Sequence, residues 1–572
     1  MVVEQLITQH IDTWTSALRT RSTAGRGTSG KIDLYGIKKL RELILELAVR
    51  GKLVPQDPND EPASELLKQI AKERDELVKS KVIRKPKTLE KITNSKIPFE
   101  LPDGWEWCYL DDIGNWGAGS TPSRSNSEYY NGNIPWFKSG ELSSDFISDS
   151  EETVTELALQ ECSLRDNNIG DVLIAMYGAT IGKTSILNVR GTTNQAVCAC
   201  TPYSGISNVY LLTLLKAYKR IFIGMGAGGA QPNISREKLI ATVFALPPKA
   251  EQNRIICKVH ELMSLCDQLE QQSLTSLDAH YQLVETLLAT LTASQNAEEL
   301  AENWTRISQH FDTLFTTEAS IDALKQTILK LAVMGKLVPQ DPNDEPASEL
   351  LKRIEQEKAQ LVKEGKIKKQ KPLPPISEEE KPFELPVGWE WCRLGHCIHL
   401  ISGQHLKPNE YTENIIEGAI PYITGPAEFG DLNPTYSKFT IEKRAVAEPK
   451  DILVTCKGAG LGKLNVANVE IAISRQLMAI RTVRANCDYF KLLLSSMYDY
   501  FQAKGVGIAI PGISREDVIE PVISLPPLNE QDRIVSRVNA LFGTCDHLKS
   551  RLQSAQQTQL HLADALTEAA LN

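Results

Sequence analysis

The feature that most constrains this chain is a long internal duplication. The segment GKLVPQDPNDEPASELLK occurs twice without change, at residues 51–68 and again at residues 335–352. The segment PFELPxGWEWC follows at the same offset of 284 residues, at residues 98–108 and 382–392. A repeat of about 280 residues is far too long for a solenoid. The sequence therefore predicts two tandem halves, related by a pseudo-two-fold like a homodimer joined in one chain.

Shorter matches continue through both halves in the same order. ISRE recurs at Ile234 and Ile513, and LPPxxEQxRI recurs at Leu246 and Leu525. Between the tryptophan motif and ISRE, the segment GATIGK of the first half aligns with GAGLGK of the second half. The duplication therefore extends over most of each half.

Each half is predicted to contain the same four parts. A helical segment such as residues 38–49 comes first, and a proline-rich and acidic turn follows it. A region of roughly 140 residues, rich in Gly, Pro and short β-branched runs, reads as a mixed α/β domain. A long helix begins just after LPP. The first half also carries a Gly/Ser-rich insert at residues 23–31, which is typical of a flexible linker.

The predicted fold class is α+β, with two mixed α/β domains separated by an antiparallel coiled coil of long helices. The predicted boundaries are residues 1–97 (N-terminal helical region), 98–248 (first mixed domain), 249–293 (first long helix), 294–381 (central helical region), 382–527 (second mixed domain) and 528–572 (second long helix).

The long helices carry apolar residues at alternating spacings of four and three, which is the a/d seam of a coiled coil. The seam residues are Ile255, Val259, Leu262, Cys266 and Leu269 in the first half, and Ile534, Val538, Leu541, Cys545, Leu548 and Leu552 in the second. Each helix is expected to run about 40 residues, or about 60 Å. Antiparallel pairing of the two would make a rigid spacer. The alternative is two separate amphipathic helices, each packed on its own domain.

Composition excludes several classes of protein. The longest apolar runs are shorter than the eighteen or more residues of a membrane span, and the N-terminus lacks a signal-peptide pattern. Eleven scattered cysteines without a Cys-x-x-Cys motif favour reduced thiols in a cytoplasmic protein. His396, Cys397 and His399 lie close together, but no second ligand pair follows, so an ordinary packed strand is favoured over a metal site. No metal is expected.

The net charge of −9 argues against DNA binding when it is taken alone. Local potential, however, governs contact with phosphates, and much of the acid is localised. Residues 141–161 hold seven acids and no base. The charge therefore leaves DNA binding open.

The mixed domains differ strongly although the segments that flank them are nearly identical. GAGSTPSRSNSEYYNGNIPWFKSGEL, from Gly117, stands where the second half has SGQHLKPNEYTENIIEGAIPYITGPAEF, from Ser402. Common parts are expected to bind identical partners, and variable parts to read different sequences. This pattern is what a protein that recognises a two-part target needs.

The ordered motifs resemble the specificity (S) subunit of type I restriction–modification systems. The resemblance rests on the twin PFELPxGWEWC motifs, GxTP…IPW between Gly119 and Trp136, GATIGK, and ISRE…LPPxxEQxRI leading into a long helix. The twin GKLVPQDPNDEPASELL segments resemble the longer class of S subunits. One departure is that the second domain begins SGQHLKP instead of GxTP, which makes contacts inferred there less secure.

The resemblance implies two target-recognition domains, each reading one half of an asymmetric bipartite DNA site. It implies two adenine-methylating M subunits and up to two motor-nuclease R subunits as partners, and no catalytic residue in this chain. S-adenosylmethionine would then belong to the M subunits, and ATP and Mg²⁺ to the partner subunits, with no cofactor bound here.

The glycine-rich motifs of the chain itself do not favour nucleotide chemistry. GATIGKT at Gly178 is one residue short of a phosphate loop, and GAGLGKL at Gly458 lacks the Ser/Thr that binds magnesium. A turn that presents Lys183 or Lys463 to a DNA phosphate is favoured. GMGAGG at Gly224 formally matches a dinucleotide fingerprint, but no helical run follows it, so we interpret it as a chance match.

DNA reading needs side chains that reach base edges or phosphates. The candidates lie on predicted glycine-rich loops: Ser120, Thr121, Arg124, Lys138, Tyr177, Lys183, Asn194, Gln195, Gln231 and Asn233 in the first domain, and Gln404, His405, Lys407, Lys457, Lys463, Arg475 and Gln476 in the second. Any one of them could equally be a solvated loop residue. The repeated motif carries the same tryptophans in both halves, which suggests core or partner contact and not sequence reading: Trp105, Trp107, Trp389 and Trp391.

Two other classes stay open from sequence. One is an enzyme that acts directly on nucleic acid, and the other is a protein scaffold without DNA contact. If the DNA-reading hypothesis holds, the two half-site centres are expected about one helical turn apart, roughly 34 Å.

Overall fold

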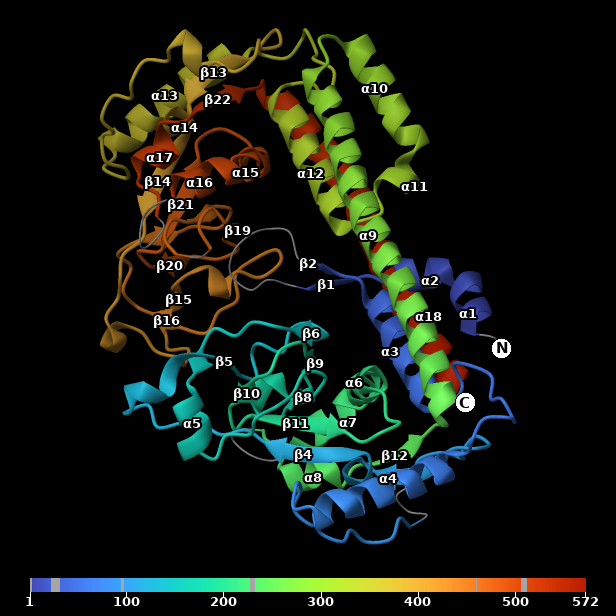
Figure 1. Cartoon of the computed structure of the whole chain (residues 1–572). Helices are drawn as coiled ribbons and strands as arrows, with labels where there is room; N and C mark the ends of the chain where they lie inside the picture. The colour runs from blue at the N-terminus through green and yellow to red at the C-terminus, as the bar shows by residue number, and fades with distance from the viewer. Residues whose placement is uncertain are drawn as a thin grey trace. The chain divides into compact units, whose positions relative to one another are not determined.

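The computed structural model describes residues 3–21, 31–93, 97–226, 232–458, 460–505 and 512–571 (Figure 1). It divides into two compact units. Among the described residues, unit 1 comprises residues 3–21, 31–275 and 556–571, and unit 2 comprises residues 276–555. The units therefore differ from the sequence halves, because the end of the second half belongs to unit 1. Residues 23–30 of the predicted linker lie outside the described residues. Among the helices that the structure describes, none is long and apolar enough to cross a membrane.

Unit 1 contains the elements of the first half. They are α1 (Val3–Gln9), α2 (Ile11–Ser16), β1 (Arg19–Arg21), β2 (Lys31–Asp33), α3 (Tyr35–Val49), α4 (Ala63–Lys79), β3 (Glu106–Tyr109), β4 (Gly114–Ala118), β5 (Tyr130–Phe137), β6 (Phe146–Ile147), β7 (Thr153–Val154), α5 (Glu156–Glu161), β8 (Val172–Ala175), β9 (Thr184–Leu187), β10 (Thr192–Thr193), β11 (Val197–Pro202), α6 (Asn208–Ala217), α7 (Lys219–Gly226), α8 (Arg236–Ile240), β12 (Val243–Leu246) and the start of α9 (Lys249–Ala293).

Unit 2 repeats this order after the end of α9. Its elements are α10 (Ala297–Gln309), α11 (Phe311–Leu314), α12 (Glu318–Val333), α13 (Ala347–Lys363), β13 (Glu390–Arg393), α14 (Leu394–Cys397), β14 (Ile398–Ser402), β15 (Ile420–Ile423), β16 (Phe439–Thr440), β17 (Val446–Ala447), β18 (Ile452–Thr455), β19 (Leu464–Val466), β20 (Ile471–Ile473), β21 (Leu477–Thr482), α15 (Cys487–Ser496), α16 (Tyr498–Lys504), α17 (Glu516–Ile519), β22 (Val522–Leu525) and the start of α18 (Leu528–Leu571).

The two mixed α/β domains share one sheet topology. The main sheet of unit 1 has the order β4-β11-β8-β9-β6, and that of unit 2 has the order β14-β21-β18-β19. A second, smaller sheet contains one parallel pair in each domain, β5 with β10 and β15 with β20. The predicted tandem duplication and the mixed α/β class of both domains are confirmed by this topology. The apolar runs of β8 and β18 are buried throughout, because both faces of the sheet are covered.

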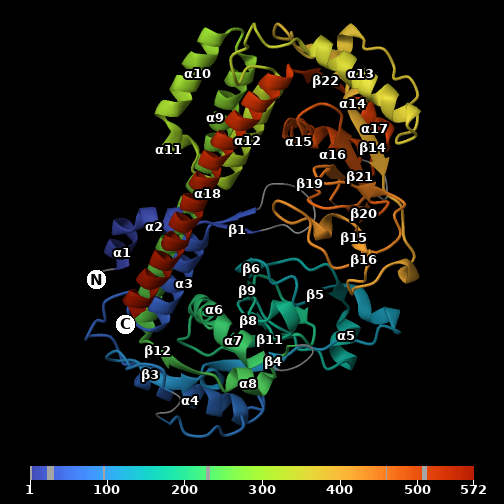
Figure 2. The ribbon, with the colours of Figure 1, turned by 180° about the vertical axis from the view of Figure 1, so that it is seen from behind.

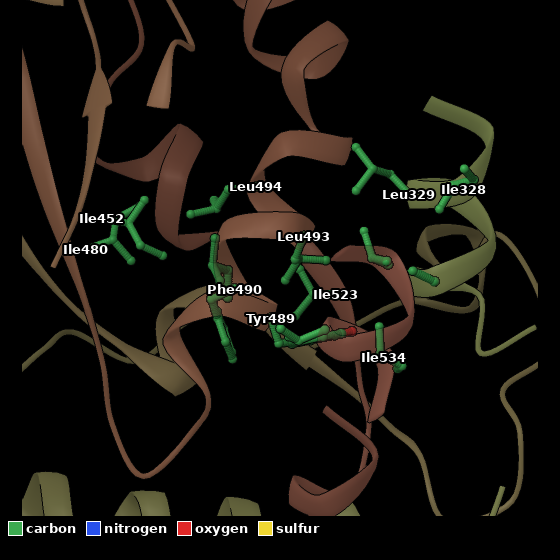
Figure 3. Close-up of a cluster of buried hydrophobic side chains, with 14 of the residues drawn as sticks. Ile328, Leu329, Ile452, Ile480, Tyr489, Phe490, Leu493, Leu494, Ile523 and Ile534 are labelled. Atoms are coloured by element: carbon green, nitrogen blue, oxygen red, sulfur yellow. The ribbon is translucent and has the colours of Figure 1, made fainter. Parts of the chain in front are cut away.

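A single hydrophobic core joins the domain of unit 2 to its helices. Tyr489, Phe490 and Leu493 of α15 lie between the sheet residue Ile480 and the α18 residue Ile534, as Figure 3 shows. All five side chains are buried. Helix α15, which follows the last sheet strand, thus packs between the sheet and the long helix α18.

The two predicted long helices are confirmed, with 45 residues in α9 and 44 in α18. All five predicted seam residues of α9 are buried, and those of α18 are buried or half-buried. Each unit holds the first part of one helix beside the last part of the other, running in opposite directions (Figure 2). This matches the antiparallel pairing that the sequence predicts.

In each unit, a third helix packs beside the two long helices. In unit 1, Arg41 of α3 contacts Asp267 of α9 at 2.6 Å, and Lys39 of α3 contacts Asp564 of α18 at 2.9 Å. In unit 2, Lys325 of α12 contacts Asp546 of α18 at 2.5 Å. An a/d seam shows that a partner exists but not how many partners there are, so the third helix was not predicted.

Candidate nucleic-acid interface

A buried hydrogen bond holds each domain to its long helix. The indole Nε1 of Trp105 donates to Glu251 at 2.9 Å, and Nε1 of Trp389 donates to Glu530 at 3.0 Å. Gln56 donates to the second oxygen of Glu251 at 3.2 Å, and the second half repeats this contact. Burial raises the pKa of Glu251, and the hydrogen bonds from Trp105 and Gln56 offset part of that effect. Trp105 is therefore part of the core, as its identity in both halves suggests.

The rest of the LPPxxEQxRI motif anchors the same joint. Arg254 contacts Asp60 at 2.6 Å, and Arg533 contacts Asp344 at 2.6 Å. The side chain of Gln252 accepts a hydrogen bond from the backbone of Ser207, at the start of α6. These contacts tie the proline-rich turn, the domain and the long helix into one rigid frame, which occurs twice. Sequence reasoning missed these roles, although the repeated Glu-Gln-x-Arg pattern was the signal.

The loop that begins at Gly119 leaves the main sheet in the same way as the loop that begins at Gly403. The amides of Gly119 and Ser120 donate to backbone carbonyls across the sheet edge at 3.0 Å each, and those of Gly403 and Gln404 do the same at 3.1 and 2.9 Å. A Cβ added at Gly119 would clash with the carbonyl of Thr193, and one at Gly403 would clash with that of Ser474. SGQHL therefore keeps the glycine that GxTP has, and Gln404 stands at the position of Ser120.

The GATIGK segment and the described residues of GAGLGK, Gly458 and 460–463, lie in turns of β-hairpins. The first joins β8 to its antiparallel neighbour β9, and the second joins β18 to β19. Gly178, Gly182, Gly458 and Gly462 have positive φ, which glycine adopts without a steric penalty. A phosphate loop precedes a helix, so the structure excludes that alternative for these turns. Lys183 is half-buried with Nζ 3.3 Å from the carbonyl of Gly140, and Lys463 is exposed.

Hydrogen bonds bring most first-domain candidates to one sheet edge. The amide of Asn194 donates to the carbonyl of Phe137, which places Asn194 beside Lys138. A β-bridge joins Tyr177 to Asn233, and the neighbouring Met176 pairs with the backbone of Ala196. Ser120, Lys138, Tyr177, Asn194, Gln195 and Asn233 thus share this edge.

The second domain repeats the arrangement with different residues. Lys457 forms a β-bridge with Gly512, and Cys456 pairs with the backbone of Gln476. Lys457 therefore takes the place of Tyr177, and Arg475 and Gln476 lie next to it. Except for the half-buried Ser120, Lys138, Lys183 and Asn194, the described candidates of both domains are exposed. Gln231 lies outside the described residues.

An acid organises the cations of the first domain. Glu152 contacts Arg124 at 2.6 Å and Lys138 at 2.5 Å. The Arg124 guanidinium also lies 5.2 Å from the ring centre of Trp136 and 4.7 Å from that of Tyr130. The hydrogen bonds from Arg124 and then Lys138 lower the pKa of Glu152 to about 2. Sequence reasoning named the two cations but missed the acid.

The second domain has the opposite charge at the matching position. The amide of Trp136 donates to the carbonyl of Glu152 at 2.9 Å, and the amide of Tyr422 donates to the carbonyl of Lys438 at 2.8 Å. Lys438 lies 3.8 Å from Glu428 and 6.0 Å from the ring centre of Tyr411. The two domains thus present different charge to a ligand on one common backbone frame.

His396 and His399 do not form a metal centre with Cys397. His396 and Cys397 belong to the short helix α14, and His399 belongs to strand β14. Within the described parts of the chain, no group of three or more His, Cys, Asp or Glu side chains could hold a metal ion.

Comparison with known proteins places both domains in one family. A family profile described as "Type I restriction modification DNA specificity domain" matches residues 102–279 and 386–557. The type I restriction enzyme EcoAI and EcoEI specificity subunits of Escherichia coli are each 48% identical to this chain, over 100% of both chains. A solved structure concerning complex assembly and conformational transition of the type I R-M system has a TM-score of 0.50 and 20% identity, over 83% of this chain and 99% of that chain. This last likeness shows the fold.

Proposed function

The chain belongs to the type I restriction–modification DNA specificity family, and from this premise we propose that its two mixed α/β domains read the two halves of an asymmetric bipartite DNA target. The observation that carries this proposal is the contrast within the chain. One frame, built on Trp105–Glu251 and again on Trp389–Glu530, holds loops whose polar residues differ at matching positions. Identical supports with unlike reading surfaces suit a target with two unlike parts.

We assign loop candidates of both domains to DNA contact by their chemistry. Asn194, Gln195 and Gln476 supply amides of the kind that pair with adenine. The guanidinium of Arg475 can donate two parallel hydrogen bonds to guanine or phosphate. The ammonium of Lys463, on its hairpin turn, can pair with a phosphate as a point charge. The rigid hairpins and the glycine-dependent loop exits support this assignment, because they fix where these side chains start.

The proposed division of labour leaves chemistry to partner subunits. Two methyltransferase subunits would dock on the twin frames, and up to two motor-nuclease subunits would join them. S-adenosylmethionine, ATP and Mg²⁺ would be bound by those partners and not by this chain. The naming of the EcoAI and EcoEI relatives as subunits of restriction enzymes supports this role. Work on cellular DNA would place the chain in the cytoplasm.

Methylome mapping tests the proposal. Cells carrying this chain and its methyltransferase partner are expected to show one methylated bipartite sequence that is absent without the chain. Replacing residues 109–245 with another domain of the family is expected to change one half-site and leave the other. A change in both half-sites would contradict the modular reading. Methyl transfer to DNA by the purified chain alone would overturn the non-catalytic assignment.

A further inference from the structure

Two extended segments take no part in the function proposed so far. Strap 1 comprises residues 80–93 and follows α4. Strap 2 comprises residues 364–377 and follows α13, at the same place in the second half. Beyond a short turn at its start, each strap is neither helix nor strand. Strap 1 belongs to unit 1, and strap 2 belongs to unit 2.

Burial along both straps repeats every three residues. The half-buried positions are Ile83, Pro86, Leu89 and Ile92 in strap 1, and Ile367, Gln370, Leu373 and Ile376 in strap 2. Every residue between them is exposed. Three residues per turn is the period of a polyproline II helix, which rises about 3.1 Å per residue. Each strap thus lies on its unit by one edge and displays its other two edges.

Hydrogen bonds hold the straps on their units. The hydroxyl of Tyr109 donates to the carbonyl of Glu90 at 2.9 Å in strap 1. The buried Arg393 donates to the carbonyls of Pro374 and Pro375 at 3.0 and 2.8 Å in strap 2. The exposed edges are therefore presented by a fixed backbone.

The displayed edges carry cations at matching positions. They are Arg84, Lys85 and Lys87 in strap 1, and Lys368, Lys369 and Lys371 in strap 2. None of the six makes an ion pair or a hydrogen bond with any residue that the structure describes. This differs from Arg124, Lys138 and Arg190 of the first domain, which all pair with acids. In a chain of net charge −9, the straps are thus concentrated sites of free positive charge.

The straps keep three cations at matching positions, although most of their other residues differ. The preceding segments, residues 51–68 and 335–352, are identical over 18 residues. The straps share five of their 14 residues, among them Lys85 with Lys369 and Lys87 with Lys371, and Arg84 is replaced by Lys368. A protein partner that fits by shape favours identical residues in both halves. A uniform polyanion requires only the positive charges.

Strap 1 also lies near helix α8 of the same unit. A backbone N–H hydrogen bond is the main cause that lowers the pKa of Glu237, and the nearby charge of Lys87 adds to it. Glu237 lies in α8, which begins three residues after the loop candidate Asn233. Lys87 of strap 1 is thus near the helix that follows Asn233 in the same unit.

We propose that the two straps bind the sugar–phosphate backbone of double-stranded DNA beside the bases that each domain reads. This inference rests on the proposed function. The contact is independent of sequence, because each displayed cation meets a phosphate and not a base edge. It adds affinity equally to target and non-target duplexes, and it makes binding depend more steeply on salt.

The test uses the chain assembled with its methyltransferase subunits and two duplexes, one with the mapped target and one scrambled. The strap variant is R84Q/K85Q/K87Q, and K68Q/K72Q/K79Q on the exposed face of α4 is a control with the same loss of charge. Each lost phosphate contact lowers the log–log salt slope by about 0.9. From 50 to 200 mM salt the wild-type complex is thus expected to lose roughly 40-fold more affinity than the strap variant.

The expected pattern is a shallower slope for both duplexes, an unchanged ratio between them, and a control that behaves like wild type. K368Q/K369Q/K371Q is expected to repeat it for strap 2. A strap variant with wild-type salt dependence would overturn the inference. A strap variant that no longer assembles with the methyltransferase subunits would also overturn it, because the straps would then be protein-docking segments. A wild-type complex without preference for the target would instead refute the proposed function.

Discussion

At the scale of single residues, one carboxylate of the first domain neutralises two candidate cations, Arg124 and Lys138. Glu152 pairs with both Arg124 and Lys138 against the Trp136 ring. A phosphate or guanine must compete with this carboxylate, so only a ligand that fits both cations gains from displacing it. We interpret Glu152 as a positioning residue that restrains binding to the wrong DNA.

Glu152→Gln is therefore expected to release positive charge. Affinity for a scrambled duplex should rise, the salt slope should steepen by up to about 2, and the preference for the target should fall. Glu156→Gln is the matched control, because Glu156 pairs with Arg190 elsewhere in the same domain. Unchanged binding to scrambled DNA would contradict the role of Glu152. Fluorescence anisotropy at several salt concentrations measures these effects.

The lowered pKa of Glu152 gives the ion pairs a pH signature. A carboxyl whose pKa is lower in the folded state adds stability at pH values above its unfolded pKa of about 4.3. That stability is lost as the pH falls toward the folded pKa of about 2. The melting difference between wild type and Glu152→Gln should be full at pH 6 and shrink below pH 4. A melting difference that grows as the pH falls would contradict this prediction.

The buried joint gives a second residue-level prediction. Glu251→Ala leaves the indole N–H of Trp105 without its acceptor, which costs about 1–3 kcal/mol. Denaturant unfolding of the single variants and of the pair with Trp105→Phe measures the coupling. Strictly additive losses would show that the hydrogen bond contributes nothing of its own.

Sequence predicted the loop candidates because polar residues among glycines are recognisable locally. It missed Glu152 and Glu251 because their partners lie far away along the chain, 28 residues for Arg124 and 146 for Trp105. Only the folded sheet and the returning long helix bring these groups together.

At the scale of elements, the long helices were the most predictable part. Their four-three spacing fixed both the helical state and the buried stripe, because burial of one stripe requires that period. The domain strands were predicted only as short β-branched runs. Their order depends on contacts between β4 and β11 or β5 and β10, which no local pattern encodes.

The seam predicts the effect of shortening both helices by one heptad. Deleting residues 272–278 of α9 and 551–557 of α18 keeps the a/d register, because seven residues restore the same face. We expect the complex to fold and either to methylate a target with fewer unread base pairs or to lose binding. An unchanged target spacing in the methylome would contradict the spacer role. Deleting four residues instead breaks the seam and should destabilise the chain.

At the scale of the whole molecule, the duplication was predicted but the composition of the units was not. Unit 1 takes in residues 556–571, which follow the second domain in sequence. Sequence identity shows which segments are equivalent, but it does not show which copy of a segment completes which unit. Tyr35 and Lys39 of the first half accordingly contact Asp564 of the last helix.

A chain ending at residue 293 is expected to pair with a second copy of itself. It lacks Asp564, but the equivalent position of α9 is Glu285, an acid that a second copy can offer to Lys39. Light scattering should report a dimer, and methylation with partner subunits should mark a palindrome built from the first half-site. A stable, folded monomer would contradict this. Glu285→Lys is expected to weaken the dimer.

The return of α18 to the first unit also has a consequence for how the protein is made. The ribosome releases the first recognition domain long before it has synthesised the segment that finishes the bundle beside that domain. Unit 1 therefore stays incomplete until residues 556–571 have been synthesised. A premature stop before residue 556 would thus impair the unit that is synthesised first.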